Sequence, residues 1–292
     1  MSVKIKDAIL KIIYKIYVNY LSRFFRFSSK PYISGDSFRN FCNHIFDENK
    51  KINPKKVNFG DYIFVKTDLF VEFFSLYHPK IENEYYLITH NSDLNVGNDE
   101  LKYIDDKIIH LFSQNLVSNF KDNVSLIPIG IENRWRLKNG KLNNFKKNSL
   151  SREKTIPIFS CFSFETNSIR NSIVYETTQN PLVEHYNQLT NKIYLDKLSR
   201  SMFCICPEGN GVDTHRIWES YIMESIPIVV LNSFTSQLKS MNFPMLYLEK
   251  WDDINNYNLM DLKKIFLEIT DLNQLKKLSS YDYWINYIKN TV

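Results

Sequence analysis

Glycine is scarce in this sequence, with only seven among 292 residues. Two of the seven, Gly209 and Gly211, stand close together in one short polar segment. Because glycine lets a backbone approach its neighbours closely, this segment is a candidate binding loop. The sequence also lacks internal repeats and low-complexity tracts, which excludes a solenoid and favours ordinary globular domains. A hydrophobic content of 43% and a charged content of 24% agree with this.

Cysteine is scarcer still. The four cysteines are Cys42, Cys161, Cys204 and Cys206, and none belongs to a C-x-x-C pair. Nothing in their spacing resembles a disulfide framework, so a reducing compartment is expected. The N-terminal residues contain no secretory signal with a small-residue cleavage site. We therefore expect a cytoplasmic protein.

Long uncharged apolar runs are missing too. Residues 3–27 are dense in Ile, Leu, Tyr and Phe, but lysines and arginines interrupt them too often for a transmembrane span. We predict an amphipathic basic helix over residues 1–30, for which two interpretations stay open. One is a peripheral contact of residues 3–27 with the anionic inner face of a membrane. The other is a helix packed on its own domain, with its lysines in water.

A large excess of charge is absent as well. The formal net charge of +5 suits an anionic substrate or an acidic membrane surface. It is too small to indicate binding to DNA or RNA. We therefore expect no nucleic acid among the partners of this protein.

Beyond residue 31, short apolar runs alternate with helical segments, a pattern typical of parallel βαβ units. The expected strands are Tyr62–Val65, Tyr85–Thr89, Lys107–Phe112, Val124–Ile129, Ile156–Phe162, Met202–Cys206, Ile226–Leu231 and Met245–Leu248. The expected helices are Ser168–Thr177, Leu182–Leu189, Asp213–Met223 and Asn232–Leu238, followed by further helix from about Asp252.

A change of composition divides this series. Arg136–Lys154 is rich in Lys, Asn, Arg and Ser, and it is the best linker candidate. We predict an α/β fold with two Rossmann-like domains, residues 31–150 and 151–292, that face a central cleft. Helical segments are expected at both termini. In such folds the ligand binds at the carboxyl ends of the strands.

The most informative segment is Phe203–Leu231, whose pattern predicts a strand, a loop, an amphipathic helix and a second strand. A glycine-containing loop that opens a helix favours anions, because the helix N-terminus carries unpaired N–H groups and partial positive charge. Arg216 in the first helical turn can bind phosphate oxygens, and Glu219 can accept hydrogen bonds from ribose hydroxyls. The segment therefore indicates a nucleotide-diphosphate pocket. The alternative is an ordinary turn with Asp213 or Thr214 as the helix cap.

Phe203–Leu231 also closely resembles the signature of exostosin-like glycosyltransferases, roughly F-x-x-x-P-x-G-x-x-x-[DS]-[TS]-x-R-x-x-[ED] followed by I-P-[IV]-[IV]. Looser matches to the bacterial and viral branch of that family precede it in the same order. They are Ile33–Phe38, Leu87–Asp93, Phe112–Asn115 and Ile127–Glu132. The resemblance spans about Tyr32 to Leu248 and implies the GT-B fold.

The resemblance implies that a sugar moves, with inversion, from a nucleotide sugar to a glycan or lipid-linked acceptor in surface polysaccharide synthesis. It also implies no metal for the diphosphate. In agreement, no two aspartates of this chain are separated by one residue, so the D-x-D metal motif is missing. We expect no other cofactor. The donor-binding residues that the resemblance implies are Arg170, Pro207, Glu208, Gly209, Asn210, Gly211, Asp213, Thr214, Arg216 and Glu219.

Inversion needs a general base opposite the leaving group, and the N-terminal domain is expected to supply it. Asp93 is the first candidate because it follows an expected strand and opens into the cleft. Asp36 is the second, and Glu132 is a further one. His90 is either catalytic or orients the acceptor or the donor phosphate. His215 is expected to be structural or to lie at the rim of the site, and not to be catalytic.

Three other functions stay open. The segment around Cys206–Glu208 is weakly similar to fucosyltransferases of the same fold. Those enzymes have Glu-Asn and Thr-Glu-Lys where this chain has Glu208-Gly209 and Thr214–Arg216, which makes fucosyl transfer the lesser interpretation. The other two are a nucleotide-sugar epimerase on the same fold and a non-catalytic protein that binds nucleotide sugars.

Overall fold

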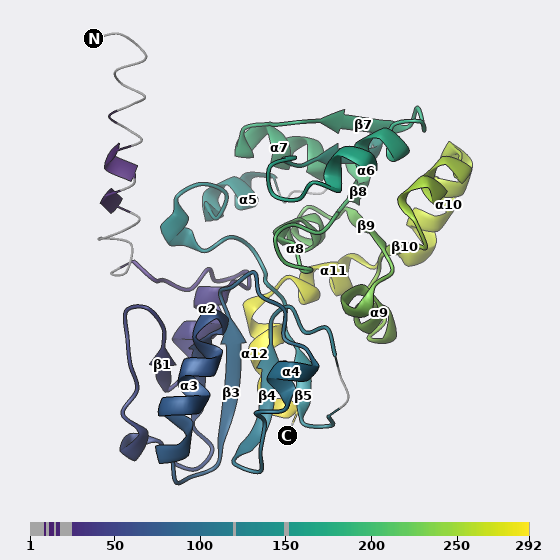
Figure 1. The fold of residues 1–292 in the computed structure, drawn as a ribbon. Coiled ribbons are helices and arrows are strands. Elements are labelled where there is room, and N and C mark those ends of the chain that lie inside the picture. Colours follow the sequence, from purple (N-terminus) through teal and green to yellow (C-terminus); the bar gives the residue numbers. More distant parts are fainter. Residues whose placement is uncertain are drawn as a thin grey trace.

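The structure of this protein is a computed structural model, shown in Figure 1. It describes residues 9, 12–14, 16–17, 25–118, 121–148 and 152–291. Most of residues 3–27 lie outside these ranges, so the membrane contact of that segment stays a prediction. Within the described ranges, none of the helices combines the length and the apolar character that crossing a bilayer requires.

The first domain is built on a sheet of five parallel strands in sequential order. The strands are β1 (His44–Phe46), β2 (Tyr62–Lys66), β3 (Tyr85–His90), β4 (Ile108–Ser113) and β5 (Val124–Leu126). Their central residues, such as Phe64, Leu87 and Leu111, are fully buried. A parallel sheet that is covered on both faces favours such continuous apolar runs. The sequence predicts every strand of this sheet except β1, in which two of the three residues are only half-buried.

Short helices connect these strands. They are α2 (Gly35–Phe41), α3 (Phe70–Leu76) and α4 (Asn98–Leu101), with the 3-10 turns η3 (Pro54–Lys56), η4 (Thr67–Leu69), η5 (His78–Lys80) and η6 (Arg134–Arg136). Phenylalanine rings fill the space between helices and sheet: Phe38 and Phe73 are fully buried. The Phe73 ring lies 5.6 Å from that of Phe46 on β1. The high aromatic content of the sequence therefore forms core.

The second domain contains another sheet of five parallel strands, in the order β10-β9-β8-β6-β7. The strands are β6 (Ile156–Cys161), β7 (Val183–Tyr186), β8 (Ser201–Ile205), β9 (Ile226–Val230) and β10 (Leu246–Leu248). The helices between them are α6 (Arg170–Thr177), α7 (Asn191–Ser199), α8 (His215–Ile222) and α9 (Ser233–Ser240). From β6 the chain builds β7 on one side and then β8 on the other. This reversal opens a crevice at the carboxyl ends of β6 and β8.

The helix predicted over Leu182–Leu189 is wrong, because β7 lies there. Its apolar residues recur at spacings of three and four, which mimics a helix. β7 is an edge strand that pairs with β6 alone, from Val183 opposite Ile158 to Tyr186 opposite Cys161. All four of its residues are half-buried. An edge strand of this kind lacks the alternation of buried and exposed residues by which a strand is recognised.

The predicted linker Arg136–Lys154 carries a helix, α5 (Leu142–Asn148). Nδ2 of its Asn144 donates a hydrogen bond to Oδ1 of Asn191 on α7 at 2.6 Å. This contact joins the segment to the second domain. The polar composition of the segment therefore reflects an exposed helix as well as a connection between domains.

The predicted helical C-terminus is present as η7 (Trp251–Asn256), α10 (Leu259–Ile269), α11 (Leu272–Leu278) and α12 (Tyr281–Asn290). We expected all of it to lie with the second domain, but α12 returns to the first (Figure 1). The Tyr281 N–H donates to the Pro31 carbonyl at 2.8 Å, and the Tyr287 ring lies 6.4 Å from that of Phe112 on β4. Trp284 of α12 is fully buried, and its ring lies 5.9 Å from that of Trp218 in the second domain, so α12 packs against both domains.

Candidate functional site

Two cavities meet at the boundary between the domains. The larger, the interdomain cavity, has a volume of about 930 Å³ and lies at the carboxyl ends of β6, β7 and β8. The smaller, the N-domain cavity, has a volume of about 290 Å³ and lies at the carboxyl ends of β2 and β3. Asp93, Ile129 and His215 line both cavities, so the two spaces adjoin. The reversal of strand order in the second sheet makes this the expected ligand site.

The structure places the predicted Arg170 and Arg216 at the interdomain cavity. Backbone carbonyls hold both side chains. Nε of Arg170 donates to the Glu208 carbonyl at 2.8 Å. Nε of Arg216 donates to the Cys161 carbonyl at 3.0 Å. Both guanidinium groups lie against the Phe162 ring, at 5.4 and 5.7 Å from its centre, so the two cations face the same space.

No described carboxylate forms an ion pair with either arginine, although the charge of Glu219 at the same cavity acts on Arg216. Among the described residues, ion pairs join other arginines to carboxylates but involve neither Arg170 nor Arg216. Burial and the charge of Arg216 lower the pKa of Arg170 to about 10. Two cations that share a cavity without an ion-paired carboxylate favour an anionic ligand, and the planar guanidinium group matches phosphate oxygens.

The helix that begins at this cavity contributes two further side chains. Thr214 occupies the N-cap position of α8, but its side chain makes no capping hydrogen bond. Glu219, one turn further on, is only 6% exposed and lines the cavity with Thr214. Burial raises the pKa of Glu219, while the charges of His215 and Arg216 act in the opposite direction. Both side chains can accept hydrogen bonds from a ligand.

Pro207 and Glu208, which the sequence places in the donor set, do not line the interdomain cavity. Their backbone carbonyls accept hydrogen bonds from Arg170, at 3.4 and 2.8 Å. The Glu208 carboxylate accepts a hydrogen bond from Asn232 at the start of α9. Both residues therefore orient Arg170 and do not face a ligand in this cavity.

Asp213 lines the interdomain cavity, and its carboxylate also holds the two domains together. Its Oδ2 accepts from the Ile129 N–H at 2.7 Å, and its Oδ1 accepts from Trp218 Nε1 at 2.9 Å. Its own N–H donates to Asn115 Oδ1 at 3.1 Å. Ile129 and Asn115 belong to the first domain, so Asp213 ties the two domains together. Burial raises the pKa of this carboxyl to about 7.

The two glycines of the loop face different neighbours. A Cβ at Gly209 would lie 3.4 Å from Nη2 of Arg170, an ordinary contact. A Cβ at Gly211 would lie 2.7 Å from Asn115 Nδ2 and 3.0 Å from the Asp93 carbonyl. Asn210, between them, donates to Asp93 Oδ2 at 3.2 Å. Gly211 therefore allows the two domains to approach, a reason that the sequence alone does not reveal.

Among the predicted catalytic residues, Asp93 is the carboxylate that reaches both cavities. It is exposed, and it follows β3 as predicted. Glu132 lines the interdomain cavity, but its Oε2 accepts hydrogen bonds from the backbone N–H groups of Asn139 and Gly140, at 2.7 and 3.3 Å. Glu132 thus holds the loop that follows it.

His90 and Asp36 are less accessible than the sequence suggests. His90 Nε2 donates to the Pro128 carbonyl at 2.9 Å, and its Nδ1 accepts from the Asn91 N–H at 2.6 Å. Burial lowers the pKa of His90 to about 4. Asp36 is fully buried, and its Oδ1 accepts from Asn91 Nδ2 at 3.2 Å. Neither side chain presents a free proton-accepting atom to the cavities, and this geometry favours a positioning role for both.

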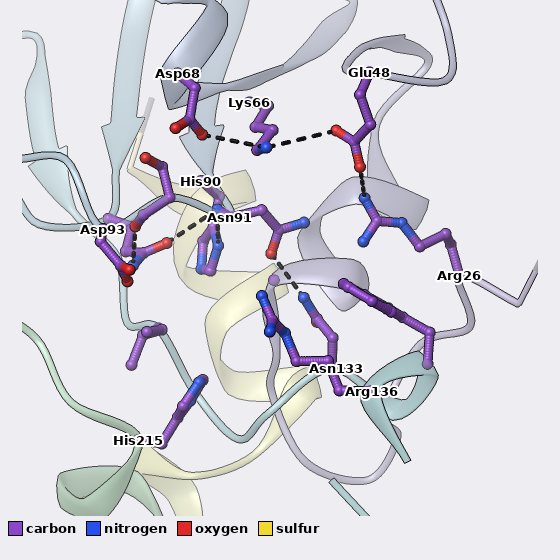
Figure 2. Close-up of a pocket in the computed structure, with 15 residues that line it drawn as sticks. Arg26, Glu48, Lys66, Asp68, His90, Asn91, Asp93, Asn133, Arg136 and His215 are labelled. Atoms are coloured by element: carbon purple, nitrogen blue, oxygen red, sulfur yellow. Dashed lines mark hydrogen bonds and ion pairs between the residues drawn. The ribbon is translucent and has the colours of Figure 1, made fainter. Parts of the chain in front are cut away.

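Asn91 and Asn133 line the N-domain cavity, and the sequence analysis missed both (Figure 2). Asn133 Nδ2 donates to Asn91 Oδ1 at 2.9 Å, and Asn133 Oδ1 accepts from the Asp36 N–H at 2.8 Å. Asn91 has a φ of 61°, in the left-handed region that non-glycine residues rarely adopt. A Cβ at Gly35 would lie 1.8 Å from Asn91 Oδ1. The available signal was the turn-forming His-Asn-Ser-Asp run directly after β3.

Charged side chains surround the rest of this cavity (Figure 2). Lys66 Nζ lies 3.4 Å from Asp68 and 3.9 Å from Glu48. Arg26 donates to the same Glu48 carboxylate at 2.8 Å, and its guanidinium lies 5.1 Å from the centre of the Trp135 ring. The cavity thus presents donors, acceptors and one aromatic ring, a set that suits a polyhydroxylated ligand.

Two Rossmann-like domains with parallel sheets, joined around a cavity at the reversal of strand order, make this an α/β protein of the GT-B class. This confirms the predicted fold class. Residues 144–289, half of the chain, match the family model described as RXYLT1 C-terminal domain. The chain belongs to this glycosyltransferase-related family. No curated protein matches it significantly.

Solved structures with a similar fold include an α,α-trehalose-phosphate synthase (UDP-forming) from Burkholderia vietnamiensis, with a TM-score of 0.45 and 8% identity over 82% of this chain and 73% of that one. AviGT4, a glycosyltransferase involved in avilamycin A biosynthesis, has a TM-score of 0.37 and 9% identity, over 77% and 86% of the two chains. The pneumococcal O-GlcNAc transferase GtfA, solved with UDP and GlcNAc, has a TM-score of 0.37 and 10% identity, over 82% and 58%.

Proposed function

We propose that this protein is a glycosyltransferase that moves a sugar from a nucleotide sugar to a hydroxyl of a glycan or lipid-linked acceptor. The observation that carries the proposal is the pair Arg170 and Arg216, which faces a cavity of about 930 Å³ and forms no ion pair with a carboxylate in the described part of the chain. The family match is consistent with this function.

The donor occupies the interdomain cavity in this proposal. The arginine pair and the N-terminus of α8 bind the diphosphate, and Glu219 accepts hydrogen bonds from the ribose. As the glycosidic bond breaks, negative charge grows on the leaving diphosphate, where fixed cations stabilise the transition state. Because two guanidinium groups supply that charge, we propose that transfer proceeds without a metal ion.

The acceptor occupies the N-domain cavity. Its volume of about 290 Å³ is that of a small subsite, and its amides and paired charges offer hydrogen bonds to hydroxyl groups. It adjoins the donor cavity at Asp93, Ile129 and His215, so an acceptor hydroxyl there faces the donor sugar. Inversion requires attack from the side opposite the diphosphate, which this arrangement of two cavities favours.

The assignment to a particular group of glycosyltransferases rests on the sequence motif alone. We propose that the protein belongs with the exostosin-like, inverting enzymes and acts in surface polysaccharide or glycoconjugate synthesis. The support is the signature over Phe203–Leu231 and the looser matches before it. A fucosyltransferase is distinguished by the donor, since GDP-fucose then binds in preference to UDP-sugars.

A ligand screen tests the donor site. A bound donor stabilises the folded protein by mass action, so the melting temperature rises with UDP-, GDP- or CMP-sugars if one of them binds. The R216A variant removes a diphosphate contact and is expected to lose at least tenfold in affinity. R200A, which removes an exposed arginine paired with Asp196, is the matched control. No stabilisation by any nucleotide sugar contradicts the proposal.

Turnover separates the remaining alternatives. A glycosyltransferase releases nucleoside diphosphate faster when an acceptor is added, and the sugar appears on the acceptor. An epimerase changes the donor sugar without an acceptor and without release of diphosphate. A binding protein shows the thermal shift but neither reaction.

A further inference from the structure

His215 is the first residue of α8, in the second domain, yet it reaches the first domain. Its side chain lines both the interdomain and the N-domain cavity. Figure 2 shows His215 at the edge of the N-domain cavity, apart from Asp93 and His90. The sequence analysis assigned this residue a structural role or a place at the rim of the site.

One hydrogen bond determines which ring nitrogen of His215 is free. Nδ1 lies 2.6 Å from the Gly130 carbonyl oxygen. A carbonyl oxygen only accepts, so Nδ1 carries the proton and donates it. In the neutral ring, Nε2 then holds a lone pair. Nε2 makes no hydrogen bond among the described residues.

The carbonyl that orients His215 is itself firmly held. Gly130 has a φ of 66°, and a Cβ there would lie 2.3 Å from the Ile33 carbonyl oxygen. The Ile131 N–H donates to that same oxygen at 2.9 Å, and Ser34 forms a β-bridge with Gly130. The Gly130 carbonyl therefore has little freedom to turn. A histidine oriented by a fixed acceptor, with its other nitrogen facing a cavity, has the arrangement of a general base.

The other titratable groups named for this junction bind protein groups, although their carboxylates keep further acceptor lone pairs. Both nitrogens of His90 bind backbone groups, and Asp36 is buried beneath Asn91. Glu132 holds the backbone of the following loop. Asp93 accepts a hydrogen bond from Asn210 across the domain boundary and is exposed to water. His215 alone among them combines a fixed ring orientation with a free acceptor nitrogen.

We infer that His215 is the catalytic base of the transfer, an inference that rests on the proposed function. Nε2 takes the proton of the attacking acceptor hydroxyl. The oxygen of that hydroxyl forms the bond to C1 of the donor sugar. The bond from C1 to the diphosphate oxygen breaks, and its electron pair leaves with the nucleoside diphosphate. The base thus comes from the donor domain, and Asp93 contributes to contact between the domains.

The test compares two variants. In H215N the amide nitrogen still reaches the Gly130 carbonyl, but the proton-accepting Nε2 is gone. D93N keeps the shape of the sequence-predicted base and removes its charge. Release of nucleoside diphosphate is measured from UDP-glucose, UDP-N-acetylglucosamine and GDP-mannose, with water and with methyl glycosides as acceptors. Dissociation constants for UDP and GDP are measured in parallel.

We expect H215N to lower turnover roughly 10²- to 10⁴-fold, with UDP or GDP affinity within twofold of the wild-type value and a smaller loss in D93N. Turnover of H215N within threefold of wild type overturns the inference, as does a larger loss in D93N. If the wild-type protein neither binds nucleotide nor releases diphosphate, the proposed function itself fails and the base assignment fails with it.

The tautomer of His215 gives a test that needs no substrate. Nitrogen-15 NMR of the imidazole, assigned by the signals lost in H215N, distinguishes protonated from unprotonated ring nitrogens. We expect the neutral ring to carry its proton on Nδ1. A proton on Nε2 leaves no lone pair toward the cavities and overturns the inference, whatever the activity.

Discussion

At the scale of single residues, Asp36 shows how burial changes a carboxyl group. It is fully buried, and its Oδ2 has no hydrogen-bond partner in the described structure. Burial raises the pKa of Asp36 to about 6, although Arg26 and Arg39 oppose the shift. The value in an unfolded chain is about 3.9, so the folded state binds the proton more tightly. The stability that this tighter proton binding gives the folded state is complete below about pH 4 and is lost as the pH rises through 6.

D36N removes that titration. Relative to the wild type, we expect D36N to gain about 3 kcal/mol in the free energy of unfolding between pH 4 and pH 7, since one pKa unit corresponds to about 1.4 kcal/mol. Urea unfolding across this pH range measures the difference. A difference that does not change with pH contradicts the shifted pKa.

Asp47 provides a control, because its pKa shifts in the opposite direction to that of Asp36. Burial alone raises the pKa of this carboxyl, but the hydrogen bond and charge of Arg39, at 2.7 Å, bring it below its usual value. The stability from this ion pair is therefore present above about pH 4 and is lost as the pH falls through the lower folded value. Relative to the wild type, we expect D47N to lose the most free energy of unfolding at neutral pH. D36N is expected to gain free energy of unfolding at the same pH.

At the scale of elements, side-chain caps mark where the last helices begin, namely α9, α10, α11 and α12. Asn258 begins α10, and its Oδ1 accepts from the Met260 and Asp261 N–H groups at 2.8 and 3.1 Å. We expect N258A to cost about 1 kcal/mol of stability, because two donors at the helix start lose their partner. N258D keeps an acceptor there and is expected to cost less. Equal losses in both variants, measured by thermal unfolding, contradict the capping role.

The strands divide by how many neighbours they have. β3, β6 and β8 are central, with long apolar runs that the sequence predicts directly. A central strand is buried on both faces by its neighbours, which its composition reflects. The four edge strands are β1, β5, β7 and β10, and the sequence predicts β5 and β10 but not β1 and β7. The residues of β1 and β7 are mostly half-buried, whereas those of β5 and β10 are mostly buried, so short-range pattern carries less information about the two that it misses.

At the scale of the whole molecule, contacts across the domain boundary decide which residues meet. Gly211 lies where the loop after β8 meets Asn115 and the Asp93 carbonyl. We expect G211A to lower stability by about 1–3 kcal/mol through overpacking and to weaken nucleotide binding. G209A places its Cβ at an ordinary contact distance and is the matched control. Thermal unfolding with and without UDP measures both effects, and equal behaviour of the two variants contradicts the interdomain role of Gly211.

The donor side of the site was predictable because it is local. Thr214, Arg216 and Glu219 lie within one turn of helix and its cap, so their spacing alone brings them to one cavity. Arg170 follows β6, and the parallel βαβ rule brings the end of that strand beside the end of β8. Pro207 and Glu208 lie outside the cavity and hold Arg170 through their carbonyls, whereas Asp213 lines the cavity.

By itself, the sequence determined the alternating α/β class and the polar loop that opens α8, because apolar periodicity and short-range spacing act within one element. Only the tertiary structure decided how the residues of the first domain take part in the site. It buried Asp36, engaged both nitrogens of His90, placed Asn91 and Asn133 at a cavity, and joined His215 to the Gly130 carbonyl. These contacts join residues far apart in the sequence, and the packing of two domains determines them.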